Sequence, residues 1–330
     1  METIASYSEY KYQNMSDPID SKTKLKRFIL LGLLLIACVV GWHVYEYLIA
    51  GKSEADHETG TDHDIIELTK NLFELEAHNN AYLTKIDFQG KTKPFRRDDQ
   101  AAHPLLQVYN AELSQDKTST IYLMKRLYDN YELDTHINDK VNAEEEQEEL
   151  DFLQAILKTA IMKRTMKFLQ TKDIVSAEGS AQLQLLKNIW FTQYSRGGGL
   201  MGSSGFEHVF LAELKENTVL GLHNWVYFSE QEQLGNLDYK GYIQHLEMGN
   251  HNQYLAAVRF NFHNIVKTYN TLFIGTSPEL ELSLYTVCFL LSSGHPCPVQ
   301  FGTTKFAILT HSWDWHGKKL IATAYPSIEV

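Results

Sequence analysis

The hydrophobic pattern of this 330-residue chain changes its period near residue 206. Before this point apolar residues recur every three or four positions, as at Leu153, Ile156 and Leu157, so residues 64–192 are predicted to be mainly helical. Beyond it, β-branched and apolar runs between turn residues predict strands at 208–214, 218–228, 254–262, 271–275, 305–311 and 319–325. Ser277 followed by Pro278 predicts one further helix among these strands. Helices first and strands afterwards indicate an α+β fold, with a helical lobe followed by an antiparallel β-sheet lobe.

The segment from Phe28 to Ile49 is almost free of charge and is long enough for one transmembrane helix. Basic residues precede it and acidic residues follow it, so the positive-inside rule predicts a cytoplasmic tail over 1–27 and a signal anchor over 28–49. The expected localisation is that of a single-pass type II membrane protein of the endoplasmic reticulum, secretory pathway or cell surface. A cleaved signal peptide and a buried core helix are the alternatives, which the length and the charge asymmetry disfavour.

Residues 50–63 are polar and acidic and are interpreted as a linker to a single folded domain over 64–330. Within this domain we expect a mainly helical part at 64–192 and a mainly β part at 193–330. The net charge of −11 is opposite in sign to that of a general nucleic-acid binder, so any contact with nucleic acid must be local. Three cysteines are too few for a disulfide scaffold; Cys288 and Cys297 could form one bridge or remain free thiols.

Three glycines, Gly197, Gly199 and Gly202, have the spacing of a dinucleotide-binding loop. That motif requires a strand before it and a helix after it, and the predicted order here is the reverse. We interpret these glycines as a flexible loop that leads to His208 and could act as a lid.

His208 and His223 flank a predicted β-hairpin whose turn lies near Lys215 and Glu216. With the turn centred there, the two histidines would lie opposite each other, with Cβ atoms about 4.5–5.5 Å apart. One imidazole could then act as a base and the other as an acid, because its ordinary pKa of about 6.5 suits proton transfer in both directions. A register slip of one residue would put them on opposite faces, and two structural histidines remain the alternative.

Several longer segments, taken in order, resemble the EndoU (XendoU-like) family of uridylate-specific endoribonucleases. The likeness extends over 64–330 and is carried by residues 190–210 (WFTQYSRGGGLMGSSGFEHVF), 222–225 (LHNW), 238–242 (DYKGY), 273–279 (FIGTSPE) and 321–325 (IATAY).

The resemblance implies catalytic roles for His208, His223 and Lys267, and places Thr323 and Tyr325 at the nucleotide site. It implies cleavage of single-stranded, uridine-rich RNA by lyase-type transesterification, which leaves a 2′,3′-cyclic phosphate. It also implies a divalent cation, Mn²⁺, whose ligands are unknown. We provisionally assign His208 as base and His223 as acid, and expect a monomer.

Two rival interpretations stay open at this point. One is a catalytically silent RNA- or ligand-binding module on the same fold. The other is a metal site that combines His208 and His223 with His251 or His311, although neither of the first two belongs to a recognised zinc spacing. Glu207 could orient His208 or be an edge carboxylate. A local positive surface could come from Lys240, Arg259, Lys318 and Lys319.

Overall fold

The computed structural model describes residues 60–76, 84–96, 98–108, 116–140, 142–249 and 253–328. The helices are α2 (Gly60–Glu76), α3 (Thr120–Arg126), α4 (Ala143–Lys158), α5 (Ala160–Thr171), α6 (Gly179–Phe191), α7 (Gly205–Phe210), α8 (Trp225–Gln233) and α9 (Pro278–Ser292). The strands are β1 (Thr84–Ile86), β2 (Leu106–Val108), β3 (Ala212–Lys215), β4 (Thr218–Gly221), β5 (Leu237–Met248), β6 (Gln253–Phe262), β7 (Ile265–Ile274), β8 (Cys297–Phe301), β9 (Thr304–Trp315) and β10 (Lys318–Ser327).

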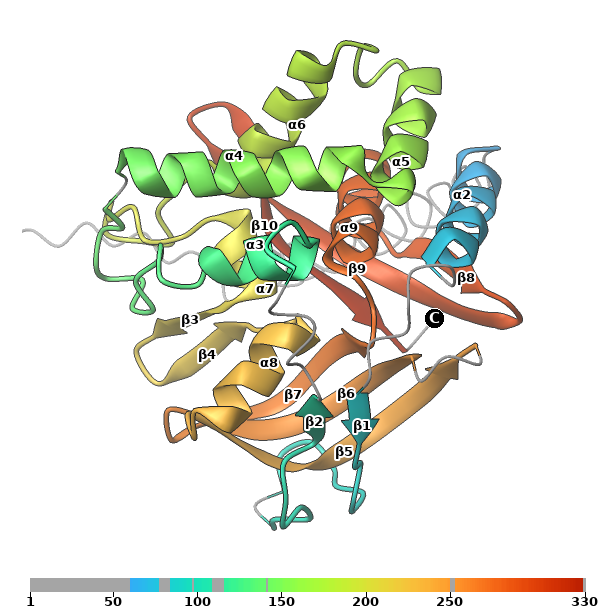
Figure 1. Ribbon diagram of the computed structural model, residues 1–330. Helices are drawn as coiled ribbons and strands as arrows, with labels where there is room; N and C mark the ends of the chain where they lie inside the picture. The colour runs from blue at the N-terminus through green and yellow to red at the C-terminus, as the bar shows by residue number, and fades with distance from the viewer. Residues whose placement is uncertain are drawn as a thin grey trace, which may run out of the picture. The chain divides into compact units, whose positions relative to one another are not determined.

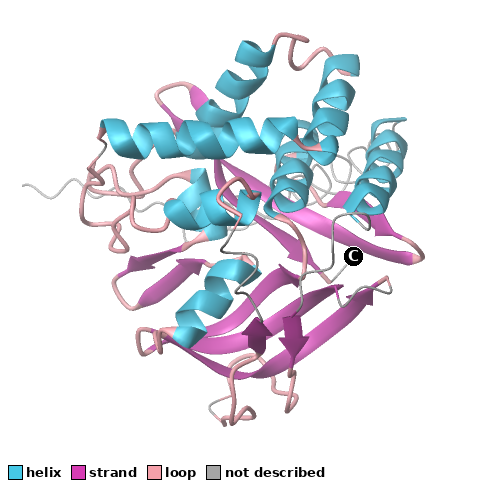
Figure 2. Ribbon diagram, viewed as in Figure 1, coloured by secondary structure: helices cyan, strands magenta, loops and turns pink. Residues whose placement is uncertain are grey.

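The strands form two three-stranded antiparallel sheets and two small two-stranded sheets. One large sheet has the order β5-β6-β7 and the other has the order β10-β9-β8. Helices α4, α5 and α6 gather at the top of Figure 1, and the β5-β6-β7 sheet lies at the bottom. Figure 2 shows most of the helices in the upper part of the molecule, whereas α8 lies against the lower sheet. The predicted α+β architecture with antiparallel sheets is confirmed.

Helix α9 is buried on nearly every side. It packs against α5 on one side and β9 on another, so it joins the helical layer to the β8-β9-β10 sheet. The predicted start of this helix is confirmed, because Ser277 is the N-cap and its hydroxyl accepts a hydrogen bond from the backbone N–H of Leu280.

The strands predicted at 254–262, 305–311 and 319–325 are confirmed within β6, β9 and β10, and the one predicted at 271–275 is confirmed in β7 except at Gly275, which follows the strand. The strand predicted at 208–214 is wrong at its start, since residues 205–210 form helix α7 and only 212–215 are extended. The strand predicted at 218–228 ends at Gly221 and is followed by helix α8. Both errors have one cause. Ser204 and Asn224 cap the two helices through their side chains, and this local bonding overrides the β-branched composition.

The predicted transmembrane helix requires a correction. Residues 28–49 lie outside the described residues, and among those described no helix has both the length and the apolar character needed to cross a membrane. The fold class is therefore corrected to α+β without its membrane helix, and the localisation as a single-pass type II membrane protein is withdrawn with it.

The structure decides the state of two cysteines that the sequence leaves open. Cys288 on α9 and Cys297 on β8 form a disulfide, and both residues are fully buried. The bridge closes a short loop and ties the central helix to an edge strand of the β8-β9-β10 sheet.

Replacing both bridged cysteines by alanine should lower the free energy of unfolding by about 2–3 kcal/mol, the effect expected for a closed loop of this length. Urea denaturation with and without a reducing agent measures this. Reductant should destabilise the wild-type chain and leave the Cys288→Ala/Cys297→Ala chain unchanged. Equal stability of the two chains under oxidising conditions would contradict a stabilising bridge.

Candidate active site

The two histidines meet, although not as the predicted cross-strand pair. The β3–β4 hairpin turns at residues 216–217 and pairs Lys215 with Thr218, a register shifted by two residues from the predicted one. His208 lies in α7 and His223 lies just beyond β4. The centroids of the two imidazole rings are 6.3 Å apart. They are held close because the backbone N–H of His223 donates a hydrogen bond to the backbone carbonyl of Val209 at 2.9 Å.

This close approach requires glycine at position 221. Gly221 has a φ of +65°, and a Cβ on it would lie 1.7 Å from the carbonyl oxygen of His208. No side chain fits there, so the end of β4 can lie against α7 only with glycine at this position.

The ring of His223 is oriented by β7. Its Nδ1 lies 2.8 Å from the backbone carbonyl oxygen of Thr271. A carbonyl only accepts, so the proton sits on Nδ1 and the lone pair is on Nε2. The next residue, Asn224, caps α8 and donates to the buried Glu281 carboxylate at 3.1 Å, which fixes the backbone on that side.

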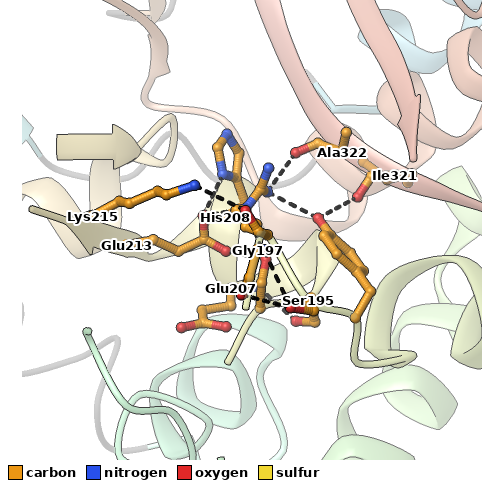
Figure 3. Close-up of polar contacts among 12 residues, drawn as sticks. Ser195, Gly197, Glu207, His208, Glu213, Lys215, Ile321 and Ala322 are labelled. Carbon is orange, nitrogen blue, oxygen red and sulfur yellow. Dashed lines mark hydrogen bonds and ion pairs between the residues drawn. The ribbon is translucent and has the colours of Figure 1, made fainter. Parts of the chain in front are cut away.

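The ring of His208 is oriented by Glu213. Its Nδ1 lies 2.8 Å from Oε2 of the carboxylate, which is completely buried. The same carboxylate accepts a hydrogen bond from Ser203 and forms an ion pair with Arg196 at 2.7 Å. Figure 3 shows the Glu213 carboxylate directed at the imidazole.

Burial keeps both imidazoles neutral in the free protein. It lowers the pKa of His208 to about 4, with a further lowering by Arg196 and an opposing effect of the Glu213 carboxylate. Burial also lowers the pKa of His223 well below its ordinary value, and Lys267 adds to the effect. Burial alone would raise the pKa of Glu213, but His208 and Arg196 hold it below its usual range. Glu213 is therefore an anion at neutral pH, with its charge directed at one imidazole only.

Lys267 lies beside this pair. Its ammonium on β7 donates to the carbonyl of Gly221. Burial lowers the pKa of Lys267 to about 7, so the group can hold or release a proton near neutrality.

The ring of Tyr325 on β10 stacks on His223, with centroids 5.1 Å apart and planes 22° from parallel. Thr323 lies two residues earlier on the same face, half-buried like Tyr325, with the buried Ala324 between them. The structure thus brings His208, His223, Lys267 and Tyr325 together. Thr323 lies next to Tyr325 on the same face of β10, two residues earlier in the chain.

Glu207 does not orient His208. Figure 3 shows its side chain pointing away from the ring. Within the described part of the chain neither of its buried carboxylate oxygens has a hydrogen-bond partner. Burial, and the charge of Glu213 next, raise its pKa well above the ordinary value, which favours the protonated form of Glu207. Sequence reasoning missed Glu213, although it is the one charged residue in the apolar run 209–214.

The glycine-rich loop before α7 is anchored at Arg196. The guanidinium donates to the hydroxyl of Tyr194 at 2.9 Å and to the carbonyl of Ala322 at 2.7 Å. The ammonium of Lys215 donates to the carbonyl of Arg196 at 2.8 Å. The loop therefore joins the β3–β4 hairpin to β10 at the site.

Across the described ranges, no group of three or more His, Cys, Asp or Glu side chains is arranged to hold a metal ion. His311 is exposed on β9, and His251 lies outside the described residues. The described residues thus offer no such ligand set for the divalent cation that the resemblance implies.

Comparisons with known proteins agree with one another. The family model for Endoribonuclease XendoU matches residues 64–326. The chain is 47% identical over 316 residues to a Drosophila melanogaster protein named uridylate-specific endoribonuclease EndoU, covering 95% of this chain and 97% of that one. It is 36% identical over 250 residues to a zebrafish (Danio rerio) uridylate-specific endoribonuclease B, covering 73% and 87%. A solved structure described as XendoU, a splicing-independent snoRNA-processing endoribonuclease, aligns with a TM-score of 0.68 and 33% identity over 80% of this chain and 97% of that one.

Replacing Glu213 by glutamine should lower the pKa of His208 below about 4, because the carboxylate is the group that raises it. An NMR titration of the imidazole nitrogens measures this shift. Glu216→Gln is the matched control, since Glu216 is exposed in the hairpin turn and should leave the titration unchanged. A His208 pKa that stays the same or rises in Glu213→Gln would contradict the assigned contact.

Proposed function

This chain belongs to the XendoU family of endoribonucleases, and we propose that it cleaves single-stranded RNA at uridines by attack of the ribose 2′-OH on the adjacent phosphorus. The observation that carries the proposal is the facing pair of imidazoles. Each has its Nδ1 engaged by the protein, so each has Nε2 left for the substrate. This is the arrangement that proton removal on one side of a phosphate and proton donation on the other require.

The environments of the two rings support a reversal of the roles assigned from sequence. His223 faces a neutral carbonyl, which stabilises an imidazolium less than a carboxylate does, and this suits a base that is neutral at the start. His208 faces an anionic carboxylate, which stabilises the imidazolium that an acid must be. We therefore propose His223 as the base and His208 as the acid. The negative charge of a bound phosphate would raise the pKa of both rings, and Glu213 directs the proton to His208.

The bond changes then balance without water. His223 takes the proton of the 2′-OH, the 2′-oxygen forms a bond to phosphorus, and the bond from phosphorus to the 5′-oxygen breaks. His208 gives its proton to that departing oxygen. The products are a 2′,3′-cyclic phosphate and a free 5′-OH. DNA lacks the attacking hydroxyl and cannot react.

Lys267 supports the transition state in this scheme. Negative charge accumulates on the phosphorus oxygens as the 2′-oxygen attacks, and a fixed ammonium beside both rings can stabilise it. Because the Lys267 pKa is about 7, this charge is present below neutrality and is lost as the pH rises through that value.

Tyr325 and Thr323 are proposed to hold the uridine. The exposed part of the Tyr325 ring can contact the nucleoside, and the Thr323 hydroxyl can bond the uracil edge from the same face of β10. Stacking on His223 positions Tyr325 next to the proposed base, which would place the bound nucleoside with its 2′-OH toward that ring.

A short RNA with one uridine among adenosines tests the function. The full-length chain should cut only after the uridine and leave a cyclic phosphate, and the same oligonucleotide with 2′-deoxyuridine should stay intact. His208→Ala and His223→Ala should each lower the rate by about 10²–10⁴-fold, the usual contribution of a general acid or base.

His63→Ala is the matched control, because His63 is 79% exposed on α2 and should be dispensable. Product analysis by mass spectrometry distinguishes the cyclic phosphate from a linear one. Cleavage at 2′-deoxyuridine, or full activity in either histidine variant, would refute the scheme.

A further inference from the structure

The loop that joins β1 to β2 is closed at its neck and stands at the bottom of Figure 1. Gln89 holds the neck. Its side-chain amide donates to the carbonyl of His103 at 2.6 Å, and its oxygen accepts from the backbone N–H groups of Ala102 and His103 at 2.7 and 2.9 Å. The N–H of Gly90 also donates to the carbonyl of Gln100 at 2.9 Å.

The base of this loop is fixed to the β5-β6-β7 sheet. Arg259 on β6 donates to the carbonyl of Asp98 at 3.0 Å, and Lys91 makes a bridge to Tyr242 on β5. The tip of the loop therefore projects from a base that is hydrogen-bonded to the sheet.

Phe95 stands at the tip with 83% of its surface exposed, the highest value among the exposed large apolar side chains of the described residues. Its φ is +64°, in a region that bulky side chains rarely adopt. Turns that need this backbone normally use glycine or asparagine. Neither packing nor backbone preference accounts for a phenyl ring here, and unexplained strain of this kind points to a binding role.

Exposed cations lie on the same loop as Phe95. Lys91, Lys93 and Arg96 are exposed. Within the described ranges Lys91 and Lys93 form no ion pair, whereas Arg96 lies 3.6 Å from the Asp98 carboxylate. Two residues expected from sequence to supply positive surface are engaged instead. Lys240 is paired with Asp99 and Asp238, and Arg259 is buried. Lys318 and Lys319 are exposed at the β9–β10 turn.

Aromatic rings continue the surface at the foot of the loop. Phe88 stacks on His245 with centroids 4.1 Å apart and planes 9° from parallel. Tyr242 and Tyr254 contact the same pair edge-on, and all four side chains are only partly buried. Burial, and next the charge of Lys91, lower the pKa of His245, so this ring is neutral at pH 7 and presents no charge of its own.

We propose that this loop surface, made of Phe88, Lys91, Lys93, Phe95, Arg96, Tyr242, His245 and Tyr254, is a second contact for single-stranded RNA. Interleaved aromatic rings and cations are what such RNA needs, because bases stack on the rings and phosphates pair with the cations. The inference rests on the proposed function, since it concerns the same RNA.

The sheet order decides which nucleotides are involved. The loop bridges to β5, whereas Lys267 lies on β7, two strands away in the same sheet. Two strand spacings amount to about 10 Å, and the tip of the loop lies farther away still. The surface therefore holds nucleotides beyond the one that is cut. Lys91 and Lys93 also supply local positive charge, which a chain with a net charge of −11 needs for contact with RNA.

An anionic membrane would use the same residue types. RNA is favoured because Lys93 and Arg96 lie within two residues of Phe95 at the tip, and because the other rings form a separate cluster at the foot of the loop rather than an apolar face at the tip. Insertion into lipid requires an apolar face free of such charges.

Binding to a 20-nucleotide RNA with one 2′-deoxyuridine among adenosines tests the proposal without cleavage. Fluorescence anisotropy with the full-length chain should show about tenfold weaker binding for Phe95→Asn, the usual effect of losing one stacked base. Asparagine suits the left-handed backbone, so thermal unfolding should not change. Phe95→Trp should bind like wild type. Leu234→Ala is the matched control, because Leu234 is also exposed, at 63%, and lies at the end of α8.

The salt dependence gives a second readout. Lys91→Ser/Lys93→Ser should reduce the slope of log K against log salt concentration by about 1.4, because each phosphate of a single strand that a cation neutralises adds about 0.7 to the slope. An unchanged slope together with unchanged binding in Phe95→Asn would overturn the proposal. So would loss of binding to vesicles containing phosphatidylserine with RNA binding unaffected, which would assign the surface to a membrane.

Cleavage separates this inference from the proposed function. Phe95→Asn should cut the trinucleotide ApUpA at the wild-type rate and should raise the KM about tenfold for a 20-nucleotide RNA with one uridine, the same factor as the weaker binding. Equal loss on both RNAs would overturn a separate contact. A wild-type chain that cuts neither RNA would refute the proposed function, and the binding measurements would then still decide whether this surface holds RNA.

Discussion

One buried carboxylate, that of Glu213, determines how the site is assembled. A fully buried anion is costly unless hydrogen bonds and opposite charge surround it, and here they come from Ser203, Arg196 and His208. The first two belong to the glycine-rich loop and the third to α7, while Glu213 itself is on β3. The Glu213 carboxylate therefore holds these three segments together. Its contact with His208 also fixes the orientation of that imidazole.

A second set of contacts places the other half of the site. Two side chains of β7 hydrogen-bond the end of β4. The ammonium of Lys267 donates to the carbonyl of Gly221, and the amide of Asn270 donates to the carbonyl of Leu222 at 2.8 Å. The same strand offers the Thr271 carbonyl to His223. Strand β10 then adds Tyr325 from the other large sheet. The proposed chemistry needs proton-transfer groups on two sides of one phosphate. The residues of the site come from α7, the end of β4, β7 and β10, which no single hairpin could bring together.

The parts of the fold that sequence predicts well are those governed by pattern. The β-branched and apolar runs of β9 and β10 and the Ser277–Pro278 start of α9 are local signals that tertiary contacts leave unchanged. The failures occur where one side chain decides. Ser204 and Asn224 start helices that composition alone would not predict, and the two-residue turn of the hairpin shifts the register by two. The approach of the histidines could not be foreseen either, because it depends on Gly221 lying against the carbonyl of His208. Both Glu207 and Glu213 are fully buried, and their hydrogen-bond partners distinguish them: Glu207 is adjacent to His208 but unpaired within the described chain, whereas Glu213 is five residues away and bonded to it.

The central claim is that Glu213 makes His208 the proton donor to the leaving group, and a substrate with a leaving group that needs no proton tests it most directly. Uridine 3′-(4-nitrophenyl phosphate) is such a substrate, because nitrophenolate departs as a stable anion. Rates of the full-length variants on this ester and on a uridine-containing RNA should separate the two histidines. The account predicts that Glu213→Gln and His208→Ala lose activity on RNA but keep most of it on the ester, while His223→Ala loses both. The opposite pattern, with His223→Ala active on the ester and His208→Ala inactive, would contradict it.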